Sequence, residues 1–130
     1  MGSVCLWLAA ILTILITLAH VFLGGPVVVD ALFSSQDLPE NAVWLAYFTW
    51  HDGTVVLPIC AIAFALAARN TGQLGVAIVA ATIVSGIGLL GLGTALLGGA
   101  PLWGTPAPYA FNLIGLVAWA GILIRSRRAS

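Results

Sequence analysis

Four long apolar stretches, separated by short polar segments, dominate the sequence. They cover residues 4–23, 42–68, 74–97 and 107–124. Each is near or above the roughly 20 residues that a helix needs to cross a hydrocarbon core of about 30 Å. None alternates between apolar and polar residues with a period of two, so the pattern favours helices over the strands of a barrel. The pattern therefore predicts an all-α fold: a single domain built as an antiparallel four-helix transmembrane bundle.

The segments between the stretches predict where the helices end. Gly24-Gly25-Pro26 is expected to stop the first helix, and the polar residues 34–41 are expected to form a longer first loop. Residues 69–72 predict a tight turn, and the Gly- and Pro-rich residues 98–106 predict the last loop. The first stretch follows no positive residue and precedes no A-x-A site, so we expect it to remain as a membrane helix.

The composition predicts that most of the protein surface faces lipid and not water. The chain of 130 residues is 62% hydrophobic and 6% charged, whereas soluble domains are about 45–50% apolar and about a quarter charged. A soluble fold of this size has too much surface to hide so many apolar side chains. Nucleic-acid binding needs a basic footprint, and intrinsic disorder needs the opposite composition, so both are excluded. The expected partner of this surface is the lipid bilayer.

The few charges predict an orientation. The chain has no lysine, and its arginines lie in the second loop and the C-terminal tail: Arg69, Arg125, Arg127 and Arg128. Its acidic residues lie in or near the first loop: Asp30, Asp37, Glu40 and Asp52. Because positive residues are retained on the cytoplasmic side, both termini are expected there, in a multi-pass protein of a bacterial inner membrane.

The third helix carries a run of small residues. The four-residue spacing of Ala77, Ala81 and Ser85 continues into glycines at positions 86, 88, 91 and 93. Small residues let helix backbones approach closely in lipid, either inside the bundle or at the seam of a homo-oligomer or a membrane-protein partner. The letters from Gly86 to Gly91 match G-x-G-x-x-G, but they lie within a membrane helix and so predict packing, not a nucleotide site.

Polar side chains inside the apolar stretches are the candidates for function. His51 is 18 residues from Arg69, and His20 is 17 residues from Ser3, which places both about 25–27 Å above the cytoplasmic side. Ionisable residues at such a depth usually face the bundle interior or a wet cavity. Asn112 lies at about 20 Å by the same count.

We therefore predict a ligand-binding site in the outer leaflet. Its expected members are His20, Tyr47, Trp50, His51, Asp52 and Asn112, with Tyr109 as a further wall and Asp30 as a cap. Adjacent residues of a helix point about 100° apart, so His51 and Asp52 can reach one ligand only if Gly53 unwinds the helix. Pro58, which leaves one backbone carbonyl without a donor, favours such a kinked or partly unwound segment.

Several functions remain open at this stage. The histidines can simply bond across helices while Asp52 caps a broken helix, or the site can bind a small molecule or a lipid. His20 and His51 could instead ligate haem b or a metal, and an intramembrane His-Asp pair is also compatible with a proton-coupled transporter. No catalytic residues are predicted, because G-x-S-x-G, H-E-x-x-H and C-x-x-C are absent. The favoured interpretation is a ligand- or lipid-binding protein, or an accessory subunit of a larger membrane complex.

Residues from His20 to Ala68, with Gly24-Gly25-Pro26 and then Trp50-His51, resemble small bacterial four-helix integral membrane proteins of unassigned function. The similarity covers under half of the chain. It implies a four-helix membrane fold and assigns no role to any residue.

Overall fold

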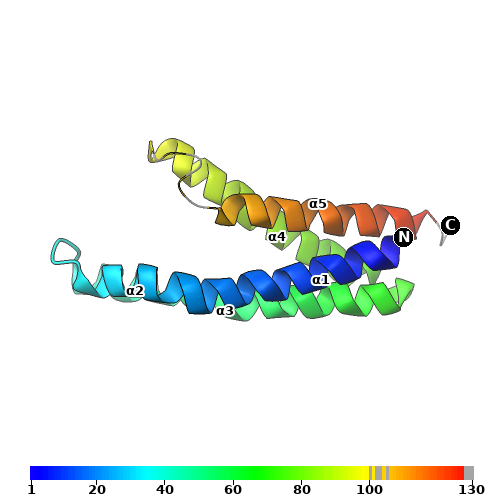
Figure 1. The fold of residues 1–130 in the computed structure, drawn as a ribbon, viewed down its shortest axis with the longest axis horizontal. Coiled ribbons are helices and arrows are strands. Elements are labelled where there is room, and N and C mark those ends of the chain that lie inside the picture. Colours follow the sequence, from blue (N-terminus) through cyan, green and yellow to red (C-terminus); the bar gives the residue numbers. More distant parts are fainter. Residues whose placement is uncertain (100, 102–103, 105, 128–130) are drawn as a thin grey trace.

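The computed structural model describes residues 1–99, 101, 104 and 106–127, and these are helical or in short connections, without a strand. The first helical segment consists of α1 (Gly2–Ala19), the π-helix η1 (His20–Gly24) and α2 (Gly25–Ser34). The others are α3 (Glu40–Arg69), the short 3₁₀ helix η2 (Thr71–Gln73), α4 (Leu74–Leu97) and α5 (Ala107–Ser126). In the described part of the chain, four helical segments are long and apolar enough to cross a membrane (Figure 1).

The prediction that Gly24-Gly25-Pro26 ends the first helix is wrong. The helical segment continues without a break from Gly2 to Ser34, well beyond the expected end at residue 23. Pro26 has no N–H to donate to the carbonyl four residues before it. The backbone widens to a π-helical turn just before this point, where the Gly25 N–H bonds to the His20 carbonyl. The first loop is consequently shorter than expected and consists of residues 35–39.

The second helix is also less disturbed than expected. α3 runs as one helix from Glu40 to Arg69, with Pro58 inside it, so the unwinding at Gly53 that would let His51 and Asp52 reach one ligand does not occur. Its ends lie two residues before and one residue after the expected 42–68. α4 has the predicted bounds, and α5 extends two residues beyond the expected 124.

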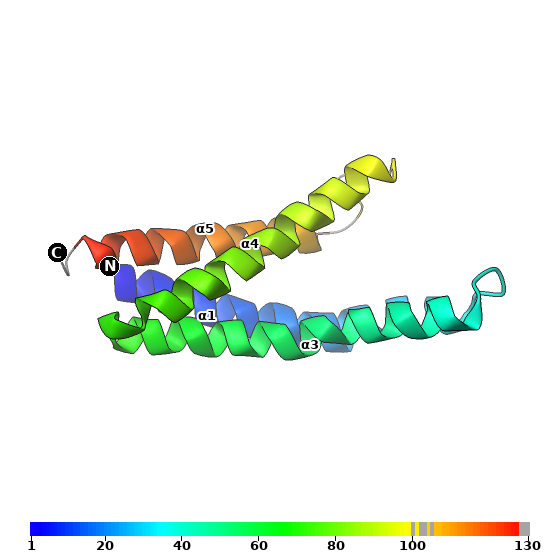
Figure 2. The same ribbon diagram turned by 180° about the vertical axis from the view of Figure 1, so that it is seen from behind.

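The helices form two layers that separate toward one end. α1 packs beside α3 and α5, and α4 packs beside α5 and α3. Figures 1 and 2 show α1, η1 and α2 lying alongside α3 over their whole length, whereas α4 crosses the bundle obliquely and diverges from α3 toward its C-terminal end. The buried core consists mainly of alanines, and its largest fully buried side chains are Phe64, Leu6 and Leu57. Alanines allow the close helix approach that holds bundles together in lipid.

Two glycines of α4 are part of this internal packing. A Cβ atom at Gly88 would lie 2.6 Å from Asn112 Nδ2, and one at Gly91 would lie 2.9 Å from Pro108 Cγ. The same atom at Gly86 or Gly93 would meet nothing within 4 Å. The interpretation of the small residues as packing within the bundle is therefore confirmed for Gly88 and Gly91, both of which face α5.

Candidate functional site

His20 joins the first helical segment to α3. Its Nε2 donates a hydrogen bond to the backbone carbonyl of Trp50 over 2.9 Å. The two rings are stacked, with centroids 4.0 Å apart and planes 20° from parallel. Because His20 is the first residue of the π-helix, the widened turn and the bridge between the helices coincide.

Two glycines make this contact close. A Cβ atom at Gly24 would lie 2.9 Å from Trp50 Cη2, and one at Gly53 would lie 3.3 Å from His20 Nε2. Each ring therefore lies over a glycine of the opposite helix, which explains Gly24 as a packing residue and not as a helix stop. Sequence reasoning missed this pairing. The signal in the sequence was a ring and a glycine on the same face of each helix. His20 and Gly24 are four residues apart, and Trp50 and Gly53 are three residues apart.

Among the described residues, His51 has its ring contact and its hydrogen bond within α3. Its ring meets Tyr47 edge to face with centroids 4.5 Å apart, and its Nδ1 lies 3.5 Å from the Thr54 hydroxyl. Tyr47 also contacts Phe33 of α2 at 5.2 Å, and Phe33 contacts Trp44 at 5.3 Å. An aromatic cluster thus fastens the outer end of the α2–α3 hairpin, and His51 borders it.

Asn112 belongs to a different part of the molecule. Its Nδ2 donates to the Pro108 carbonyl of its own helix over 2.8 Å, and its side chain covers Gly88. Among the described residues, no hydrogen bond or ring contact joins it to His20 or His51. The predicted members are thus divided between the His20–Trp50 bridge, the Tyr47–His51 contact and the α4–α5 contact. Asp30, the predicted cap, is exposed on α2.

Asp52 lies outside all three groups. Its side chain is exposed, and in the described part of the chain it has no hydrogen bond or ion pair. It occupies one row of outward residues with alternating spacings of three and four, here called the α3 stripe: Leu45, Phe48, Asp52, Val55, Ile59, Ile62 and Leu66. The apolar members of the α3 stripe are 46–65% exposed.

The first helical segment offers a direct comparison with the α3 stripe. Its own outward row, here called the α1 stripe, has the same spacing and is apolar throughout: Val4, Leu8, Ile11, Leu15, Leu18 and Phe22. Such a row suits contact with acyl chains. The α3 stripe differs in having a carboxyl group among its apolar side chains, and this difference distinguishes the two surfaces.

Ligation of haem b or a metal by His20 and His51 stays a prediction. Nε2 of His20 is engaged by the Trp50 carbonyl, and one face of its ring is covered by the indole. Binding an iron or another metal at Nε2 would require that bridge to open. Among the described residues, no group of three or more His, Cys, Asp and Glu side chains could hold a metal ion.

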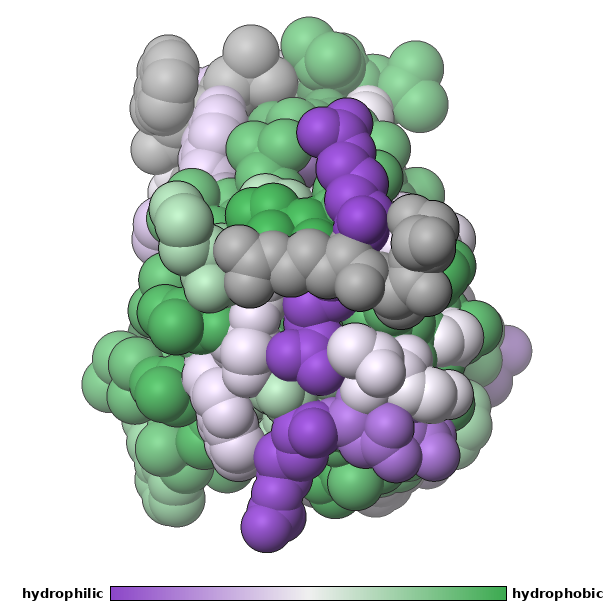
Figure 3. Space-filling view, turned by 90° about the vertical axis from the view of Figure 1, so that its right-hand side faces the viewer, coloured by the Kyte–Doolittle hydropathy of each residue, from purple (hydrophilic) through white to green (hydrophobic). Residues whose placement is uncertain are grey.

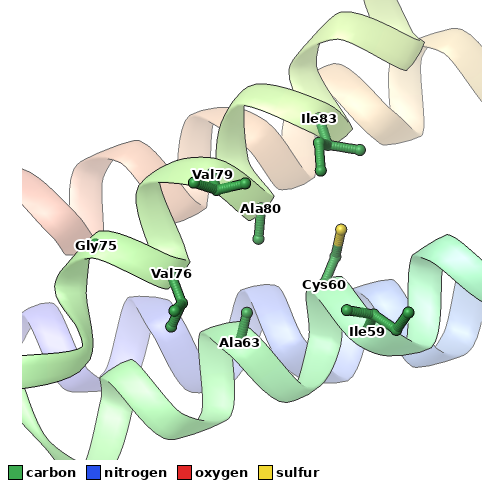
Figure 4. A pocket seen from close by; sticks show the side chains of 8 residues that line it. All are labelled: Ile59, Cys60, Ala63, Gly75, Val76, Val79, Ala80 and Ile83. Carbon is green, nitrogen blue, oxygen red and sulfur yellow. The ribbon is translucent and has the colours of Figure 1, made fainter.

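An apolar groove lies between α3 and α4, nearer than the histidines to the end of the bundle where the two termini lie (Figure 1). Its volume is about 320 Å³, and the side chains of the two helices face each other across it (Figure 4). Its lining consists of Ile59, Cys60, Ala63, Gly75, Val76, Val79, Ala80 and Ile83. None of the predicted ligand-binding residues is among them. The groove arises where α4 begins to diverge from α3, which is a tertiary feature that the sequence pattern does not encode.

Comparison with protein-family models, with curated proteins and with solved structures finds no match, so function is inferred from the geometry of this chain alone.

Proposed function

We propose that this protein is a four-span membrane protein and a non-enzymatic subunit of a larger membrane assembly. We propose further that the α3 stripe contacts its partner in the outer leaflet. The observation that carries the proposal is the exposed and unpaired side chain of Asp52 within that otherwise apolar surface. A carboxyl group facing acyl chains is unfavourable, by up to about 2.5–3.5 kcal/mol at the bilayer centre on insertion scales, so such groups are usually paired.

The arrangement of the helix ends supports an orientation with both termini in the cytoplasm. The Ser3 hydroxyl donates to the Ala68 carbonyl over 2.7 Å, and Gly2 packs against Gly121 and Arg125. These contacts gather the start of α1 and the ends of α3 and α5 at one end of the bundle. Arg69, Arg125 and Arg127 lie there, while Arg128 falls outside the described residues. Figure 3 views this end and shows hydrophilic side chains between hydrophobic flanks. Retention of positive charge on the inner side then favours the inner membrane with cytoplasmic termini.

The depth of Asp52 supports a partner for either tilt of α3. Asp52 is 17 residues from Arg69, or about 25 Å along the helix. If α3 stands upright, the 12 residues before Asp52 reach about 18 Å farther, beyond a hydrocarbon core of about 30 Å. Trp44, Leu45 and Phe48 would then expose apolar surface to water. If α3 tilts to submerge them, Asp52 moves deeper into the hydrocarbon. A protein that covers the α3 stripe removes the unfavourable exposure in both cases. In the first it shields apolar side chains from water, and in the second it shields the Asp52 carboxyl group from acyl chains.

Lipid binding is a second candidate, supported by the groove between α3 and α4. Its lining is apolar on both sides, which suits an acyl chain and offers nothing to orient a polar ligand. A lipid held there would remain bound after gentle extraction.

Native mass spectrometry of protein extracted in mild detergent tests the proposed function. The measured mass of the wild-type complex is expected to exceed the 13.4 kDa of one chain by the mass of at least one further protein chain. Asp52→Leu is expected to lower the assembled fraction about tenfold, since a polar contact between membrane helices contributes about 1–2 kcal/mol. The matched control is Thr82→Leu, which replaces an exposed polar residue whose hydroxyl bonds to its own helix. It should leave the assembly intact. A wild-type protein released as a single chain would contradict the proposal.

A further inference from the structure

We infer that the partner on the α3 stripe is a second copy of this chain, packed in parallel so that each Asp52 lies beside His51 of the other copy. This inference rests on the proposed function and names the partner of the same surface.

The α3 stripe has the register of a coiled-coil seam. Its successive intervals are three, four, three, four, three and four residues, so it places Leu45, Asp52, Ile59 and Leu66 at one heptad position. Phe48, Val55 and Ile62 occupy the other. Apolar residues with this average period of 3.5 are what two helices need to pack along their whole length. The α3 stripe covers 22 residues, 45–66, and its ends lie about 31 Å apart, close to the hydrocarbon thickness. The opposite face of α3, with Leu57 and Phe64, is already buried inside the chain.

A parallel second copy supplies a polar partner for Asp52. In parallel packing, the first heptad position inserts between four residues of the facing helix, which include its own equivalent and the residue immediately before that equivalent. Asp52 of each copy therefore lies beside both Asp52 and His51 of the other, and the His51 ring supplies the N–H donor that two facing carboxyl groups need. Among the described residues, the hydrogen bond and the ring contact of His51 both lie within α3, so neither ties its ring to another helix. Two-fold symmetry forms the pair twice, and a polar pair in an apolar seam fixes the register.

The orientation of the chain favours a copy over an unrelated partner. All copies insert with the same end in the cytoplasm, so α3 of one copy meets α3 of another in parallel and at equal depth. Asp52 of one copy then lies at nearly the same depth in the membrane as His51 of the other. An antiparallel contact would instead place Asp52 opposite the other heptad position, which carries only the apolar Phe48, Val55 and Ile62. The α1 stripe, which is apolar throughout, offers no such pair.

Disulfide crosslinking tests the inference. In a chain with Cys5 and Cys60 replaced by alanine, Val55→Cys places a thiol on the α3 stripe and Leu15→Cys places one on the α1 stripe. Both positions are exposed, at 62% and 56%, and they lie within about 3 Å of each other in depth. Mild oxidation in native membranes is expected to give at least fivefold more covalent dimer for Val55→Cys. Adding His51→Leu should reduce that dimer severalfold.

The outcomes separate the two proposals. Equal crosslinking at both positions overturns the second copy on the α3 stripe. A larger assembly in native mass spectrometry without a Val55→Cys dimer overturns it too, and leaves the proposed function with a different protein as partner. A single chain carrying only lipid overturns both. Circular dichroism of each cysteine variant confirms that its helices are intact.

Discussion

Replacing Gly88 with leucine is expected to separate α4 from α5 and to lower the free energy of unfolding by about 3 kcal/mol, the upper end of typical overpacking costs. A Cβ atom there would lie 2.6 Å from the side-chain nitrogen of Asn112 and 2.9 Å from its backbone nitrogen. The side chain can move, but the backbone of α5 cannot do so without opening the bundle. The loss of packing therefore outweighs the gain of about 1 kcal/mol in helix propensity.

Gly86 provides the matched control for this prediction. It lies two residues away on the same helix, and a Cβ atom there would meet nothing within 4 Å. Gly86→Leu should therefore unfold at the same denaturant concentration as the wild type, or at a higher one. Unfolding of both variants in mixed detergent micelles, followed by circular dichroism, measures the difference. Equal stability of the two variants would show that α4 and α5 do not meet at Gly88.

His20→Leu is expected to destabilise the hairpin of the first helical segment and α3. The change removes the hydrogen bond to the Trp50 carbonyl, worth about 0.5–1.5 kcal/mol, and the ring stacking, worth about 0.5–1.5 kcal/mol. We expect a total loss of about 1–3 kcal/mol, since the two contacts join the same pair of helices. His20 is also the first residue of the π-helical turn, and its ring lies over Gly53.

The other histidine serves as the control for His20. Among the described residues, the ring contact and the hydrogen bond of His51 join it to Tyr47 and Thr54 of its own helix, so His51→Leu should destabilise the separated chain less than His20→Leu does. In the proposed dimer it should instead reduce association. Thermal unfolding at high detergent-to-protein ratio reports the first effect, and native mass spectrometry reports the second. If the two histidine variants lose equal stability as separated chains, the bridging role of His20 is wrong.

The sequence predicts the helices well because lipid restricts the backbone. A segment that enters hydrocarbon must satisfy its own N–H and C=O groups, so an apolar run of sufficient length becomes a helix. The bounds of α4 follow directly from this. The same constraint explains the failure at Gly24-Gly25-Pro26. Glycine and proline end helices where water can form hydrogen bonds with the freed backbone groups. Here a π-helical turn keeps the chain helical instead, and the Trp50 ring covers Gly24.

The candidate site was harder to predict because residue counting gives depth and not direction. Counting placed His20 and His51 at one level, and the structure shows that they bond to different partners. Asn112 faces Gly88 because the packing of α4 on α5 fixes the rotation of its helix. The spacing of the α3 stripe is visible in the sequence, but its outward direction follows only from the burial of Leu57 and Phe64 on the other face. That direction makes Asp52 an exposed group and not part of an internal pocket.

The accessibility of the α3 stripe to lipid-dissolved oxygen tests the central claim most directly. A nitroxide label at position 55, in protein extracted with its native lipids into nanodiscs, would report whether this surface is covered. The matched label at position 15 lies on the apolar α1 stripe. We predict that the label at position 55 is shielded from oxygen by a contacting protein while the label at position 15 is freely relaxed by it. Equal, high oxygen accessibility at both positions would contradict the account, because the surface around Asp52 would then face lipid.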